Sequence, residues 1–145
     1  MMQRLFLALL LNLLLATNLP AADNFADLVA NCKVAIRLAE AAADAPLTKD
    51  LHAQMQSEKC WTYLQAFQDA LAWSAIKQAS SGDNKPSMRE ILKHLPYCVP
   101  DHVTFKQQAL ILVNHAERNP EHLKWPAGAV FGEVMLNSFR CSDLP

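Results

Sequence analysis

Apolar residues recur every three or four positions along most of the chain, which is the spacing of one face of an α-helix. The first such pattern follows Asn24, which with Asp27 resembles a capping box, and it runs through Cys32. It fades in residues 41–46, where Pro46 cannot continue a helix. The pattern therefore predicts a first helix that begins just after Asn24 and ends within this alanine-rich stretch.

A second helical pattern follows in a long stretch without Gly or Pro, with Thr48 as its candidate N-cap. It should be the longest element of the fold. Turn-forming residues occupy positions 80–86 and separate the two halves of the chain. The apolar positions that define this helix are Leu51, Met55, Cys60, Tyr63, Leu64, Phe67, Leu71 and Ile76.

The second half of the chain begins with Ser87 and Glu90, which fit a capping box and predict a short helix that Pro96 stops. Residues 97–100 form an extended link. A further helix is predicted from about Val103 to Glu117. Its apolar run could also form a buried strand, but the chain offers no second strand to pair with it.

The last predicted helix begins at Asn119 and Pro120, an N-cap followed by Pro at the first helical position, and continues to Cys141. Pro126 should kink or restart it. The chain holds only three glycines and no segment of alternating apolar and polar residues. The predicted fold class is therefore all-α, with four to five helices.

The N-terminal residues have the layout of a secretory signal peptide, with one positive charge at Arg4, an apolar run and small residues up to Ala22. The apolar run is shorter than the ~18 residues that suggest a membrane span. We therefore predict a signal peptide over residues 1–22, one helical domain over residues 23–145, and no stable membrane anchor after cleavage.

Charge and cysteine content narrow the class of partner and the compartment. The formal net charge is −1, and removing the signal peptide with Arg4 makes it −2. Nucleic-acid binding requires clustered Lys and Arg, so we exclude it. All four cysteines, Cys32, Cys60, Cys98 and Cys141, lie in the exported part. An even number of cysteines in a small exported domain predicts two disulfides, each worth about 2–4 kcal/mol.

The sequence contains no convincing motif for catalysis or metal binding. The sequence has no nucleophile elbow, no glycine-rich phosphate loop and no haem-attachment motif. His94, Cys98 and His102 are four residues apart and would align as metal ligands on a helix, but Pro96 and Pro100 remove that helix. We predict no catalytic residue, no cofactor and no metal site.

Five further polar residues are read as ordinary helix-end or helix-surface residues. His115 and His122 flank the Asn119-Pro120 turn, where histidines usually serve as caps or favour the negative end of the helix dipole. Glu117, Glu121 and Glu133 fit a solvated helix face. Hydrolysis by paired carboxylates would need a cleft and a shifted pKa that a sequence does not reveal.

The aromatic content is large for a small helical core. Trp61, Trp73, Trp125, Phe131 and Phe139 either fill the core or line an interface with a partner, where Trp is favoured. Both interpretations remain open at this point.

Several short motifs resemble those of one protein family. They are Cys60-Trp61-Thr62-Tyr63, Tyr97-Cys98-Val99-Pro100, Gln107, Asn119-Pro120-Glu121 and Phe139-Arg140-Cys141. This set resembles the Rap/Tai family of immunity proteins, although that family favours Gly at positions 62 and 66 and Pro at position 140. The resemblance implies a small helical protein with an HdeA-like core, located in the periplasm of a Gram-negative bacterium. Some members form homodimers and block the active-site cleft of peptidoglycan amidases delivered by type VI secretion.

The disulfide connectivity is left open, because four cysteines allow three pairings. Simple helical hairpins would join Cys32 to Cys60 and Cys98 to Cys141. The resemblance implies instead that Cys32 pairs with Cys98 and Cys60 with Cys141, and we favour this second pairing.

The leading hypothesis is a periplasmic inhibitor that forms a homodimer and that binds and neutralises a secreted cell-wall hydrolase. Its candidate contact residues are Gly82, Asp83, Asn84, Lys85 and Met88, since a protruding polar segment on a rigid scaffold suits insertion into a cleft. The alternatives are an HdeA-like acid-stress chaperone, a periplasmic binding protein not tied to a toxin, and, with least support, a small hydrolase.

Overall fold

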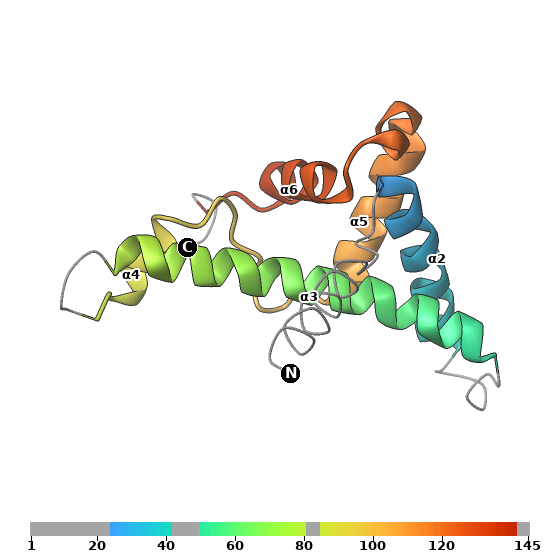
Figure 1. Cartoon of the computed structure of the whole chain (residues 1–145), viewed down its shortest axis with the longest axis horizontal. Helices are drawn as coiled ribbons and strands as arrows, with labels where there is room; N and C mark the ends of the chain where they lie inside the picture. The colour runs from blue at the N-terminus through green and yellow to red at the C-terminus, as the bar shows by residue number, and fades with distance from the viewer. Residues whose placement is uncertain (1–23, 42–49, 81–84, 142–145) are drawn as a thin grey trace, which may run out of the picture.

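The computed structural model describes residues 24–41, 50–80 and 85–141, and all regular structure within these ranges is helical (Figure 1). This confirms the predicted all-α fold. The elements are helix α2 (Phe25–Ala41), helix α3 (Leu51–Ala79), helix α4 (Met88–Leu92), helix α5 (Phe105–Arg118), the 3-10 helix η1 (Pro120–Lys124) and helix α6 (Ala127–Ser138).

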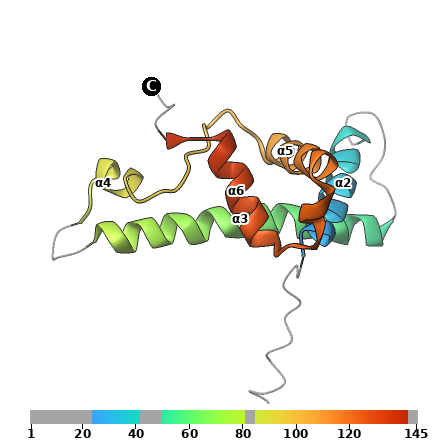
Figure 2. The same ribbon diagram turned by 90° about the horizontal axis from the view of Figure 1, so that it is seen from above.

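Helix α3 runs the length of the molecule and the other helices are distributed along it (Figure 1). Helices α2 and α5 pack near its N-terminal end, α6 lies over its middle, and α4 lies at its C-terminal end. Viewed from above, α4, α5 and α6 lie on the same side of α3 (Figure 2). The core forms where α2, α3, α5 and α6 meet, around Phe25, Leu64, Leu112 and Phe131.

The helix starts follow the local signals in the sequence. The Asn24 side chain accepts a hydrogen bond of 3.0 Å from the Asp27 backbone amide, which confirms the predicted start of α2. The capping box at the start of α4 is also confirmed, because the Ser87 and Glu90 side chains bond reciprocally to backbone amides. For α3 the prediction of Thr48 is wrong: position 48 lies outside the described residues, and the Asp50 side chain caps the helix instead.

The structure contains two disulfides, Cys32–Cys60 and Cys98–Cys141, so the predicted number is confirmed. The favoured pairing, Cys32 with Cys98 and Cys60 with Cys141, is wrong. Helices α2 and α3 pack side by side and bring the Cα atoms of the first pair to 5.0 Å. The Cys98 backbone amide donates to the Phe139 carbonyl over 2.9 Å, which holds the extended link beside the end of α6 and favours the second pair.

The C-terminal segment is more divided than the sequence predicts. Instead of one helix from Asn119 to Cys141, it forms η1 and then α6, which starts after Pro126 and ends at Ser138. Pro126 therefore restarts the helix, as expected. Asn119 makes no side-chain cap for η1; its backbone amide donates to the His115 carbonyl over 2.9 Å and so ends α5.

The aromatic residues divide between the core and the surface, so the core interpretation is confirmed for some of them and the interface interpretation stays a prediction for the others. Phe131 is fully buried, while Trp61 and Phe139 are partly buried against the core. Trp73 and Trp125 are exposed. At Gly128 the backbone of α6 lies close to a side chain of α3, because a Cβ there would be 3.4 Å from the Phe67 ring. No helix among the described residues is long and apolar enough to cross a membrane.

Candidate functional site

The candidate site is the end of the molecule farthest from α2 and α5, which we call the tip and define as residues 77–80 and 85–95. It consists of the last residues of α3 and the short helix α4 that packs against them (Figure 1). The Ser87 and Glu90 capping box fixes the start of α4, and hydrogen bonds from Ser87 lower the pKa of the Glu90 carboxyl. The tip thus presents a helix of only five residues with a defined beginning.

Helix α4 carries an apolar row toward solvent. Met88 and Leu92 are one helical turn apart, so their side chains lie on one face, and they are 69% and 40% exposed. Ile91 and Leu95 are only half-buried. Large apolar side chains that are exposed next to one another are typical of a binding surface.

A basic row lies beside this apolar row. Arg89 and Lys93 are also one turn apart, and Lys77 and Lys85 add two more exposed cations at the tip. Among the described residues of the tip, Glu90 is the one acidic side chain, while the whole chain carries a formal charge of −1. The tip is therefore positive on a protein that is otherwise slightly acidic.

The base of the tip is held by covalent and polar contacts. The Cys98–Cys141 disulfide ties the link after α4 to the end of the chain, and the Cys141 sulfur lies 3.7 Å from the Leu95 carbonyl oxygen. Tyr97 is buried beside them, its hydroxyl has no hydrogen-bond partner, and burial raises its pKa to about 12. This anchorage positions α4, which has no buried residue of its own.

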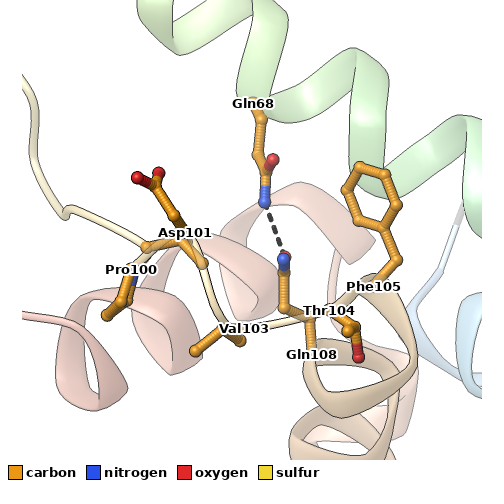
Figure 3. Close-up of a pocket in the computed structure, with 8 residues that line it drawn as sticks. Gln68, Pro100, Asp101, Val103, Thr104, Phe105 and Gln108 are labelled. Atoms are coloured by element: carbon orange, nitrogen blue, oxygen red, sulfur yellow. Dashed lines mark hydrogen bonds between the residues drawn. The ribbon is translucent and has the colours of Figure 1, made fainter.

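A pocket of about 420 Å³ with a mixed polar and apolar lining lies between α3 and the start of α5 (Figure 3). In its lining the side chains of Gln68 on α3 and Gln108 on α5 point toward each other, and the Gln68 amide donates to the Gln108 side-chain oxygen over 2.6 Å. Gln108 is 2% exposed, so this bond satisfies a polar group within the core. Asp101 is the one titratable residue of the lining, and it points away from Gln68 and Gln108 (Figure 3). The lining of the pocket is better suited to binding a side chain of a partner protein than to catalysing a reaction.

The structure brings together the two histidines that flank the Asn119-Pro120 turn, which the sequence assigned only to helix ends. The ring nitrogens of His115 on α5 and His122 on η1 are 2.9 Å apart, and His122 stacks on Trp125. Burial, and then the neighbouring His122, lower the pKa of His115. The two histidines are seven residues apart across the turn at Asn119-Pro120, and this spacing is the sequence feature that could have indicated their contact. No group of three or more potential metal ligands gathers within the described ranges, and two nitrogens alone fall short of a zinc site.

The structure describes only two of the five contact residues that the sequence predicted. Lys85 and Met88 lie exposed on the tip, whereas Gly82, Asp83 and Asn84 lie outside the described residues. Cys98 is disulfide-bonded and therefore supplies no thiolate between His94 and His102. The residues that sequence analysis missed are Leu92, Arg89 and Lys93, whose i to i+4 spacings in the predicted helix contained the signal.

Comparisons with known proteins match one family. The family model described as Rap1a immunity proteins matches residues 24–141, which include every described helix. No curated protein and no solved structure matches the chain.

Proposed function

We propose, from the premise that this chain belongs to the Rap1a family of immunity proteins, that it binds and neutralises a secreted cell-wall hydrolase. Membership confirms the resemblance seen in the motifs and makes the chain an immunity protein, whose partner is a secreted effector protein. Such proteins generally act by binding and not by catalysis. The finer proposal is that the effector is a peptidoglycan amidase delivered by type VI secretion, met by a homodimer of this chain in the periplasm.

The observation that carries the proposal is the exposed apolar and basic surface of the tip. An inhibitor of a hydrolase must fill a cleft that substrate would otherwise enter. Met88 and Leu92 can supply the apolar anchors of such an interface, and Arg89 and Lys93 can pair with carboxylates at its rim. Because the disulfide at the base holds α4 in place, little ordering is needed on binding.

Two features support the periplasmic location within this proposal. The N-terminal segment has signal-peptide character, and Cys32–Cys60 and Cys98–Cys141 would persist only in an oxidising compartment. An effector that degrades the cell wall also acts in this compartment.

The test begins with affinity capture by the mature chain, residues 23–145, from periplasm and from culture fluid of sibling cells that deliver effectors. We expect one stoichiometric cell-wall hydrolase, identified by mass spectrometry, whose release of fragments from purified peptidoglycan is inhibited by the added protein. The double variant Met88→Asp, Leu92→Asp should weaken inhibition by about a hundredfold, because both anchors of the interface become charged. Leu110→Asp on α5, an exposed position remote from the tip, is the matched control.

A captured hydrolase that the protein does not inhibit would refute the inhibitor function. Equal inhibition by the tip variant and the control would refute the assignment of the tip.

The acid-stress chaperone remains a second proposal, favoured by one observation. Burial lowers the pKa of His115, so protonating this side chain at low pH would oppose its 2.9 Å contact with His122 and make the contact acid-sensitive. If the binding of an apolar dye and the oligomeric state are the same at pH 7 and pH 3, this alternative is excluded.

A further inference from the structure

One side of α3 faces the core, and the opposite side is exposed along most of the helix. The core side carries the buried residues Cys60, Leu64 and Ala75. At about 100° per residue, a single stripe on the far side carries six residues, all exposed, which we call the outer face. These residues are Met55, Lys59, Thr62, Ala66, Asp69 and Trp73.

The ends of the outer face carry large apolar side chains that the protein leaves in water. Met55 is 53% exposed and Trp73 is 63% exposed, although neither is needed to cap or terminate the helix. The spacing along the face is four, three, four, three and four residues. This is the spacing of the contact seam between two helices that pack along their length.

The positions of the outer face are symmetric about Leu64, and the residues at equal distances from it are complementary. Met55 and Trp73 each lie nine residues from Leu64, Lys59 and Asp69 each lie five, and Thr62 and Ala66 each lie two. In a two-fold dimer, residue i of one protomer meets residue j of the other, and j meets i. We therefore infer that the outer face binds the same face of a second copy of this chain, with the two α3 helices antiparallel about an axis beside Leu64.

Each pair that this arrangement creates is chemically matched. Met55 meets the partner's Trp73, a thioether against an aromatic ring. Lys59 meets the partner's Asp69, and neither residue forms an ion pair with another side chain among the described residues. Thr62 meets the partner's Ala66 at the crossing point, where small side chains allow the helix axes to approach within about 8–10 Å.

The charges on the outer face favour the antiparallel orientation and favour a second copy of the chain as the binding partner. A parallel pair in register would place Lys59 on the partner's Lys59 and Asp69 on the partner's Asp69, and both contacts repel. The outer face itself is neutral, with one lysine and one aspartate, whereas the tip is basic. A second copy supplies both complementary charges, which a hydrolase cleft suited to a positive tip does not.

The inferred interface rests on the homodimer within the proposed function, but it leaves the tip free. Helix α4 and the outer face use different residues, and α4 lies with α5 and α6 on one side of α3 (Figure 2). Loss of the dimer and loss of inhibition can therefore be measured separately.

The test is the mass of the mature chain by sedimentation equilibrium, at neutral pH, across concentrations from monomer to dimer. Lys59→Glu and Asp69→Lys should each raise the dimer dissociation constant by at least about tenfold, because each places like charges together. The double variant Lys59→Glu, Asp69→Lys should restore dimerisation, since the charges are then exchanged. Ala66→Glu should also abolish the dimer, and Gln65→Glu, an exposed position off the outer face, should not.

Three outcomes overturn the inference, with helix content by circular dichroism confirming that each variant is folded. A wild-type chain that stays monomeric has no such interface. A dimer that survives Ala66→Glu uses another surface. Single charge reversals that weaken the dimer without rescue by the double variant exclude the antiparallel register. Inhibition of the captured hydrolase by a monomeric variant would leave the proposed function intact.

Discussion

Gentle reduction should open the two disulfides in a fixed order. Cys32 and Cys60 are each 0% exposed within the core, whereas Cys98 is 7% exposed and Cys141 is half-buried near the end of the chain. Thiol exchange requires access of the attacking thiolate to a sulfur atom. We expect Cys98–Cys141 to open in the native protein and Cys32–Cys60 to open only when the core unfolds.

Loop length does not account for this order. Cys98–Cys141 spans 43 residues and Cys32–Cys60 spans 28, so the loop-entropy relation gives about 4.0 and about 3.6 kcal/mol of stabilisation. The two bonds are thus nearly equal in their effect on the unfolded chain. The variant Cys98→Ser, Cys141→Ser should lose about 4 kcal/mol in urea unfolding, and Cys32→Ala, Cys60→Ala should lose more, because it also leaves a cavity in the core.

The assay is a time course of mild reduction at neutral pH, with new thiols alkylated and identified by mass spectrometry. We expect labels on Cys98 and Cys141 well before labels on Cys32 and Cys60. Simultaneous labelling of all four cysteines, without loss of helix content, would refute the argument from burial. An alkylated protein in which only Cys98–Cys141 is open should also inhibit its effector less, because that bond holds the base of the tip.

Three further predictions concern single residues. Gly132→Ala should raise the free energy of unfolding by about 0.5–1 kcal/mol, because the new Cβ would lie 3.8 Å from the Phe67 ring and alanine favours a helix interior. Tyr97→Phe should stabilise the fold or leave it unchanged in urea unfolding, since it removes a buried hydroxyl without a partner. The lowered pKa of His115 means that the unfolded chain binds more protons below the ordinary value of 6.5, so stability should fall as pH drops through that value, and His115→Gln should flatten the dependence in denaturation curves.

The sequence predicted the elements well because the signals for helix starts are local. An N-cap side chain acts on amides two or three residues away, so Asn24 and Ser87 determine their helix starts without reference to the rest of the fold. The same holds for Pro126, whose missing amide breaks the last helical segment wherever that segment packs.

Contacts between elements were harder to predict, because they depend on how helices pack. Simple helical hairpins indicated the observed disulfide pairing, and the family resemblance indicated the wrong one. Choosing between them required knowing that the Cys98 backbone amide bonds to the Phe139 carbonyl. The contact of His115 with His122 depends on the turn made by η1. The face of α3 that remains exposed could be assigned only once the core side was known.

The length of α3 connects the two proposed surfaces. In its last three turns Ala75 is the one buried residue, so this part of the helix gains little from the core that α2 and α5 build on its first half. The last turns of α3 instead support α4 on one side of the helix and carry the exposed Trp73 on the other. A shorter α3 would keep the core but lose the support of α4 and the Trp73 end of the outer face. Variants in the last turns of α3 should therefore affect binding more than stability, whereas Leu64→Ala in the core should cost about 2–5 kcal/mol in the free energy of unfolding.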